Sequence, residues 1–189
     1  MSFLRRPKAA KLIMSFLYRE ESLLKEVLAA ADREYGPVDF LSEALPFEFT
    51  SYYEREMGKN LKRRLAGFRP LILPERLPEI KLWANERENL HRDEKGCRKI
   101  NIDPGYLAPA KLILATGKDY SHRIYLGAGI YGDLTLMFQK GSFTALPWTY
   151  PDYASSPLID LITLLRKRFL WQLKNTGFQE SGDKQIKRR

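Results

Sequence analysis

The sequence predicts an α+β domain with a mainly antiparallel sheet, a ferredoxin-like β-α-β-β-α-β arrangement, an extra β-hairpin and a C-terminal helix. Three observations predict this class. Up to Asp103, short strand-like runs alternate with two helical patterns. Glycine-separated strand-like runs follow, and a long apolar repeat of helical spacing closes the domain before a polar tail.

The first two elements have the clearest signals. Residues 11–18 form an apolar run rich in Leu, Ile and Phe, which is typical of a buried strand. Residues 19–36 repeat apolar side chains at helical spacing, with Glu20 and Glu21 near the positive end of the helix dipole. Gly36 and Pro37 end this predicted helix.

Two extended segments and a second helix come next. Residues 38–49, interrupted by Pro46, and residues 61–72 are expected to pair antiparallel, with residues 50–60 as their connection. A helix is predicted over residues 74–92, because Pro74 is tolerated in a first turn and apolar residues recur at helical spacing. Its predicted buried stripe is Leu77, Ile80, Trp83, Ala84 and Leu90.

The alternation in residues 98–103 predicts a strand with Ile100 and Ile102 inward and Lys99, Asn101 and Asp103 outward. This strand completes the ferredoxin-like pattern. Further strand-like runs cover residues 110–116, 122–127 and 133–139.

The closing helix is predicted over residues 155–174, with Ser156 as N-cap and Pro157 at the first helical position. The predicted organisation is a basic arm over residues 1–10, one domain over residues 11–175 and a disordered basic tail over residues 176–189.

Charge and composition narrow the function classes. The formal net charge is +9, of which residues 1–11 carry +4 and residues 179–189 carry +2, so that the body of the chain is nearly balanced. No run of about 18 apolar residues and no signal-peptide pattern occurs, so we expect neither a membrane span nor secretion. The single cysteine, Cys97, fits a reducing compartment, and a cytoplasmic location is expected.

Two familiar motifs fail in their context. Gly127–Gly132 matches G-x-G-x-x-G, but strand-like residues follow it where a dinucleotide site needs a helix, so the glycines predict a hairpin turn. His91-Arg92-Asp93 resembles the start of a kinase catalytic loop, but it precedes the glycines and Arg98 stands where that loop needs Asn. With only two histidines, far apart, a zinc site is not predicted.

The strongest candidate site combines two predicted turns. Asp103-Pro104-Gly105-Tyr106 has type II turn chemistry, in which Asp103 would cap the turn. The turn between two predicted strands carries Lys118, Asp119, His122 and Arg123. If both turns lie at one sheet edge, Lys118 and Arg123 could hold an anionic group while Asp103 or His122 moves a proton.

Interpretations without a functional role stay open for these residues, since a charged turn is often only solvated and a histidine at a strand start is often structural. Tyr106 and Glu86 are added as predicted ligand-binding residues, and the possible walls of the site are Glu86, Asn85, Tyr52, Tyr53 and Glu56. The aromatic segment with Trp148, Tyr150 and Tyr153 is either a lid over the core or a stacking surface.

The Asp103–Tyr106 motif resembles the hallmark of a bacterial family, domain-of-unknown-function family 4416. The segments LPFEFTSYYEREMG, KLILATGKDYSHRIYLG and LPWTYPDY are also similar to it, so the resemblance extends over most of the chain. It implies a bacterial source and a stand-alone domain but no established activity. Some members carry a GTP-binding label, which the absence of a P-loop motif does not support here.

The sequence therefore favours a site for a small anionic ligand, phosphorylated or nucleotide-like. The alternatives are an RNA- or DNA-binding protein that uses its basic termini, Lys62-Arg63-Arg64 and exposed aromatics, or a non-catalytic interaction domain. Whether the chain is an enzyme, which cofactor it uses and its oligomeric state are not predicted.

Overall fold

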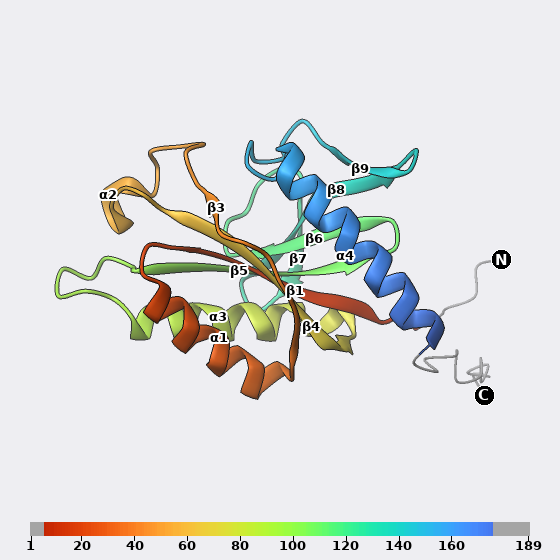
Figure 1. Cartoon of the computed structure of the whole chain (residues 1–189), viewed down its shortest axis with the longest axis horizontal. Helices are drawn as coiled ribbons and strands as arrows, with labels where there is room; N and C mark the ends of the chain where they lie inside the picture. The colour runs from red at the N-terminus through yellow and green to blue at the C-terminus, as the bar shows by residue number, and fades with distance from the viewer. Residues whose placement is uncertain (1–5, 176–189) are drawn as a thin grey trace.

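The computed structural model describes residues 6–175, which form four α-helices and a nine-stranded antiparallel sheet (Figure 1). The sheet order is β2-β4-β1-β5-β6-β8-β7, while β3 pairs with β4 and β9 with β8. The elements are β1 (Ala10–Tyr18), α1 (Glu21–Tyr35), β2 (Val38–Leu41), β3 (Leu45–Pro46), α2 (Glu54–Met57), β4 (Lys62–Ile72), a 3-10 turn (Pro74–Arg76), α3 (Leu77–Leu90), β5 (Ile100–Ala108), β6 (Lys111–Thr116), β7 (Arg123–Gly127), β8 (Ile130–Gln139), β9 (Ser142–Ala145) and α4 (Ser156–Asn175).

Helices cover both faces of the sheet. In Figure 1, α1 and α3 lie on one face and α4 on the other. Each face has its own core, in which Met14 and Phe16 pack with α1 and α3, and Ile13 packs with α4 residues such as Ile162. All nine residues of β1 are buried, because the strand lies in the middle of the sheet with both faces covered.

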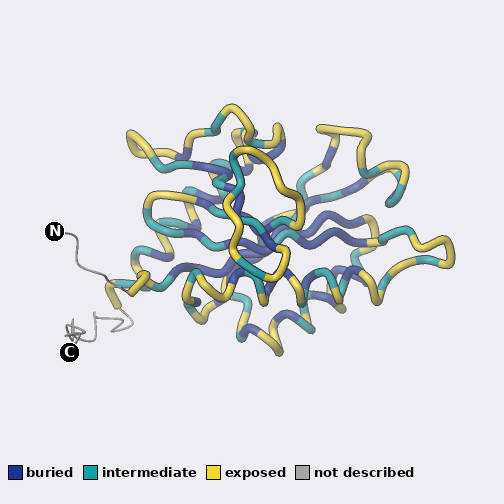
Figure 2. The backbone as a smooth tube through the Cα atoms, turned by 180° about the vertical axis from the view of Figure 1, so that it is seen from behind, coloured by how far each residue is buried: buried dark blue, intermediate teal, exposed yellow. Residues whose placement is uncertain are grey.

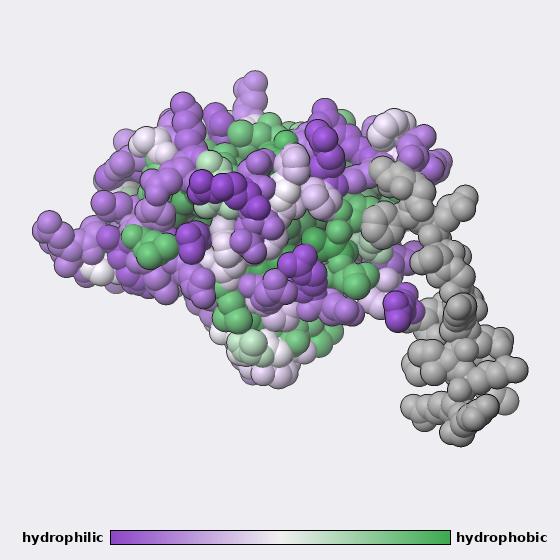
Figure 3. All heavy atoms as spheres, turned by 90° about the horizontal axis from the view of Figure 1, so that it is seen from below, coloured by the Kyte–Doolittle hydropathy of each residue, from purple (hydrophilic) through white to green (hydrophobic). Residues whose placement is uncertain are grey.

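The solvent faces of the helices are polar. Figure 3, viewed from the side of α1 and α3, shows hydrophilic side chains over much of this face with apolar patches between them. In α1 the buried residues are Leu23, Leu24, Val27, Ala31 and Tyr35, which follow the predicted helical stripe. None of the helices in the described part of the chain is long and apolar enough to cross a membrane.

Several predictions about the elements are confirmed. The segment after α1 supplies β2 and β3, and both pair antiparallel with β4. The glycine-rich run is a hairpin, since β7 and β8 are joined at Ala128 and Gly129, which both have positive φ. The C-terminal helix is also confirmed, whereas β9 was not predicted.

The predicted turn at Asp103–Tyr106 is wrong, because the motif lies inside β5. Gly105 is paired with Leu114 of β6, and a Cβ at Gly105 would clash with the carbonyl oxygen of Ile113. Pro104 is tolerated because β6 pairs with β5 only from Gly105 onward, so no bond to β6 requires an N–H at Pro104. In this motif, residues that usually form turns instead allow two strands to approach closely.

Two predictions about burial are also wrong. Asn101 is buried, not solvent-facing, because its partner Leu17 in β1 packs against the 47–61 segment. In α3, Leu90 is 65% exposed, whereas Lys81 and Glu88 are buried. The predicted N-terminal arm includes Ala10, which already belongs to β1, and the predicted tail lies outside the described residues.

We predict that Gly105→Ala lowers the free energy of unfolding by about 3 kcal/mol, because the new methyl group would meet backbone atoms of β6. Urea unfolding followed by far-UV circular dichroism measures the change. Gly117→Ala is the control, since no atom lies within 4 Å of its Cβ position, and it should change stability by less than about 0.5 kcal/mol. Equal effects of the two substitutions would contradict the packing explanation.

Candidate functional site

The candidate site begins at an edge of β5 that β6 does not cover. Two side chains of α3 take the place of a neighbouring strand: Lys81 Nζ donates to the Ile102 carbonyl at 2.7 Å, and the Ile102 N–H donates to the Glu88 carboxylate at 2.7 Å. The Lys81 and Glu88 side chains are only 8% and 7% exposed. Helix α3 therefore satisfies the free peptide groups of β5 with buried charges.

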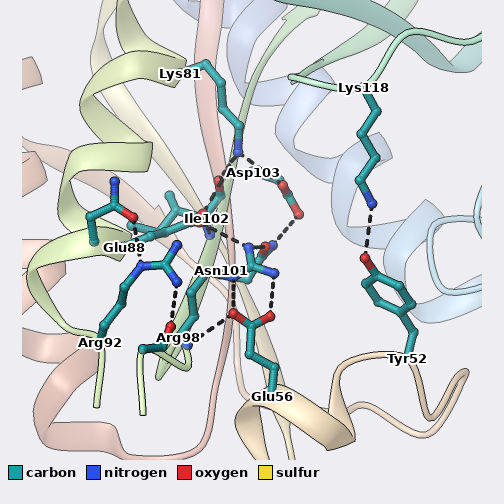
Figure 4. A network of polar contacts seen from close by, with 12 residues as sticks. Tyr52, Glu56, Lys81, Glu88, Arg92, Arg98, Asn101, Ile102, Asp103 and Lys118 are labelled. Carbon is teal, nitrogen blue, oxygen red and sulfur yellow. Dashed lines mark hydrogen bonds and ion pairs between the residues drawn. The ribbon is translucent and has the colours of Figure 1, made fainter. Parts of the chain in front are cut away.

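Asp103 is held by these charges and by its own strand (Figure 4). Its Oδ1 lies 3.5 Å from Lys81 Nζ, and its Oδ2 accepts a 2.8 Å hydrogen bond from Asn101 Nδ2. Arg98 in turn donates to Asn101 Oδ1 at 2.8 Å. The Asp103 side chain stays 26% exposed, so an oriented carboxylate oxygen pair reaches solvent.

Arg98 connects three parts of the chain. It donates two hydrogen bonds from its guanidinium to the Glu56 carboxylate, at 2.8 and 2.7 Å, and one to Glu88 at 3.1 Å. These contacts tie the 50–60 segment, α3 and β5 together (Figure 4). The hydrogen bonds from Arg98 lower the pKa of Glu56, whereas burial raises the pKa of Glu88.

A second buried ion pair lies under the same face of the sheet. Arg63 Nη2 is 2.8 Å from Asp152 Oδ2, and Arg63 also donates to the hydroxyl of Ser15, which pairs with Asp103 across β1 and β5. The ion pair is not aligned as a hydrogen bond, since Asp152 Oδ2 and Arg63 Nε have no hydrogen-bond partner. Burial raises the pKa of Asp152, and the nearby Asp103 carboxylate adds to this effect.

The residues of the predicted 118–123 turn gather around Asp133 of β8. Arg123 Nε donates to Asp133 Oδ2 at 2.9 Å, and His122 Nε2 lies 3.3 Å from the same oxygen. The His122 ring is stacked on Trp148, with centroids 5.0 Å apart. Because the Arg123 side chain is only 4% exposed and already paired, it is not a free cation for a ligand.

Strand register relates this cluster to Asp103. Gly105, which faces the same way as Asp103, is opposite Leu114, and Leu114 is opposite Asp133. Asp103 and Asp133 therefore project from one face of the sheet, and their strands are two spacings, about 10 Å, apart. This is the face that α4 covers at its other end, through Leu107, Leu112 and Leu136.

Lys118 reaches the 50–60 segment. Its Nζ donates to the Tyr52 hydroxyl at 3.2 Å, and both residues are exposed. In the close-up of Figure 4, this pair is drawn beside the Asp103 network and no bond connects the two. Lys118 is thus an exposed cation whose ammonium group has a weak contact with Tyr52.

The structure brings the predicted site residues together in part. Within residues 6–175, no hydrogen bond or ion pair joins Asp103 to Lys118, His122 or Arg123. Tyr106 is half-buried and packs between the α1–α3 core and the small cluster around Leu77. Glu86 is exposed on α3, with no hydrogen bond or ion pair to another residue of the described part of the chain. Catalytic roles for Asp103 and His122 stay predictions.

Sequence reasoning missed the charged side chains that hold Asp103. A signal existed in α3, because Lys81 and Glu88 continue the helical stripe of Leu77 and Ala84. Arg98 had no such signal, since it lies in an irregular segment, whereas Glu56, 42 residues away, was predicted only as a possible wall of the site. Among the described residues, no group of three or more His, Cys, Asp or Glu side chains is arranged to hold a metal ion.

The basic run proposed for nucleic-acid binding is largely engaged within the protein. Arg63 is buried with Asp152, while Lys62 and Arg64 lie 3.6 and 3.9 Å from the Glu21 carboxylate. These contacts leave little free positive charge in the run for phosphate groups.

A family model described as a domain of unknown function (DUF4416) matches residues 8–169. No curated protein and no solved structure matches the chain.

We predict that Lys81→Met lowers the free energy of unfolding by about 3 kcal/mol, because it leaves the Ile102 carbonyl without its donor and removes one of the positive charges that compensate Glu88 and Asp103. Chemical denaturation measures the loss. Lys25→Met, on the exposed face of α1, is the matched control and should be within about 0.5 kcal/mol of the wild type. A wild-type stability for Lys81→Met would rule out the edge-capping role.

We predict that Glu56→Gln costs about 1–2 kcal/mol at pH 7, because it weakens the bonds from Arg98. Since the folded-state pKa of Glu56 is lowered, its contribution is present above the unfolded pKa and is lost as the pH falls through the folded pKa. The stability difference should therefore shrink below about pH 4. Unfolding curves across pH test this against Glu54→Gln, and a pH-independent difference would contradict it.

Proposed function

The chain belongs to the DUF4416 family, and we propose that it binds a small anionic molecule, phosphorylated or nucleotide-like, on the sheet face that carries Asp103 and Asp133. We further interpret the order β2-β4-β1-β5, with α1 and α3 on one face, as the ferredoxin-like part of the fold. The proposed site lies on the opposite face, between the 50–60 segment and the 117–122 turn.

The observation that carries the proposal is the oriented, partly exposed carboxylate of Asp103. Lys81 is paired with this carboxylate and with Glu88, and both side chains are buried. Burying such charges is costly unless each is paired. A supporting shell of this kind holds a functional group in one geometry. Asp103 is thus suited to accept hydrogen bonds from ligand hydroxyl or amino groups.

Lys118 supplies the complementary charge. It is exposed, its ammonium group donates to the Tyr52 hydroxyl, and a phosphate oxygen would be a stronger acceptor for that group. A ligand with donor groups at one end and an anionic group at the other would use both Asp103 and Lys118.

The remaining predicted residues have supporting roles in this proposal. Arg123 holds Asp133, and Asp133 holds the His122 ring, which is 16% exposed beside Trp148. His122 can therefore contact a ligand at the rim, while Arg123 acts through Asp133 and not on the ligand. The exposed rings of Tyr52 and Tyr150 offer surfaces for stacking.

We predict that nucleoside monophosphates or sugar phosphates raise the melting temperature of the wild type, while Asp103→Asn and Lys118→Met lose most of that shift. Differential scanning fluorimetry with a panel of nucleotides, sugar phosphates and inorganic phosphate measures the shifts, and titration calorimetry gives affinities. Loss of one charged hydrogen bond should weaken binding about tenfold or more.

Matched controls are Asp160→Asn on the exposed face of α4 and Lys25→Met on α1, which should bind like the wild type. If every compound that stabilises the wild type stabilises Asp103→Asn and Lys118→Met equally, the ligand does not bind at this face. If no compound of the panel shifts the melting temperature, the proposed ligand class is wrong.

A further inference from the structure

Strand β7 is an open edge of the sheet. Within the described residues it pairs only with β8, so the peptide groups on its outer side have no strand partner. Three successive large side chains on it are exposed: Ile124 by 73%, Tyr125 by 60% and Leu126 by 40%. Figure 2, which shows the molecule from behind, has exposed backbone of this part in front of the sheet.

Beyond Arg123, which is paired with Asp133, this edge carries no charge or proline. Edge strands in monomers are commonly guarded by charges, prolines or covering segments, but residues 124–132 contain neither a charged residue nor a proline. The opposite edge is guarded: Asp39 of β2 pairs with Lys11, and Arg168 of α4 donates to the Asp39 carbonyl. Strand β7 therefore lacks the charged and helical cover that β2 has at the other end of the strand order.

We propose that β7 pairs antiparallel with β7 of a second copy of this chain, around a twofold axis at Tyr125. Beyond Arg123, whose charge is paired with Asp133, the strand is neutral and apolar, and the same strand of a second copy supplies a neutral and apolar partner. In this register, Leu126 of each copy lies opposite Ile124 of the other, and no charges are brought together. Because the β2 edge is covered, the pairing stops at two copies.

The available surface fits a dimer that dissociates on dilution. Tyr120, 60% exposed, precedes the strand and adds to its apolar surface. Side chains of this size and exposure contribute on the order of 100 Å² each, so the four from each copy bury about 800 Å² in total, which is less than a stable interface needs and fits a weak dimer. This inference does not depend on the proposed ligand, because β7 exposes these residues whether or not the site is occupied.

Sedimentation velocity over a range of protein concentrations tests the dimer. We expect the wild type to shift from monomer to dimer as concentration rises, and Ile124→Lys to stay monomeric. Leu90→Lys is the control, because Leu90 is equally apolar, 65% exposed and on α3. It should dimerise like the wild type.

Cross-linking tests the register. In a Cys97→Ser background, Tyr125→Cys should form an intermolecular disulfide on oxidation, because facing residues in antiparallel strands have Cα atoms about 5 Å apart. Leu90→Cys in the same background should not. The proposal would be overturned if the wild type stayed monomeric at all concentrations, or if Tyr125→Cys cross-linked no better than Leu90→Cys. Either result would assign this edge to a segment of another protein.

Discussion

Strand β5 extends beyond the reach of β6, and the peptide groups at its uncovered edge need hydrogen-bond partners inside the protein. Helix α3 supplies them with Lys81 and Glu88, because an ammonium group can donate to the Ile102 carbonyl and a carboxylate can accept from its N–H. Two charges buried for this purpose need charges of opposite sign nearby. Arg98 and Asp103 meet that need, so one backbone requirement leads to the whole network around the candidate site.

The fold was predictable from the sequence wherever periodicity and burial agreed. Helix α1, the antiparallel partners of β4 and the β7–β8 hairpin follow from local patterns that tertiary packing reinforces. The conformation of the Asp-Pro-Gly-Tyr segment was not predictable in this way. Its residues favour a turn locally, but Gly105 is required because the backbone of β6 approaches too closely for a side chain. No local rule reveals that two backbones meet at that glycine.

The candidate site was predictable only in outline. The sequence indicated Asp103 and the 118–123 turn, and strand register puts Asp103 and the partner of that turn, Asp133, on one face. It did not indicate which charges neutralise one another. Asp133 begins a strand-like run and gave no sign that it would pair with Arg123, and buried lysine and glutamate on a helix look like solvent-facing residues until the neighbouring strand edge is known.

The contacts of Arg98 also bear on the order in which the protein folds. Its bonds to Glu56 span 42 residues of sequence, whereas those to Glu88 and Asn101 are more local. Closing the longer loop costs more chain entropy, so α3 and β5 can come together before the 50–60 segment is fixed. Tyr52 and Tyr53 would then be ordered last and opened first, and amide hydrogens of α2 should exchange with solvent faster than those of the central strands.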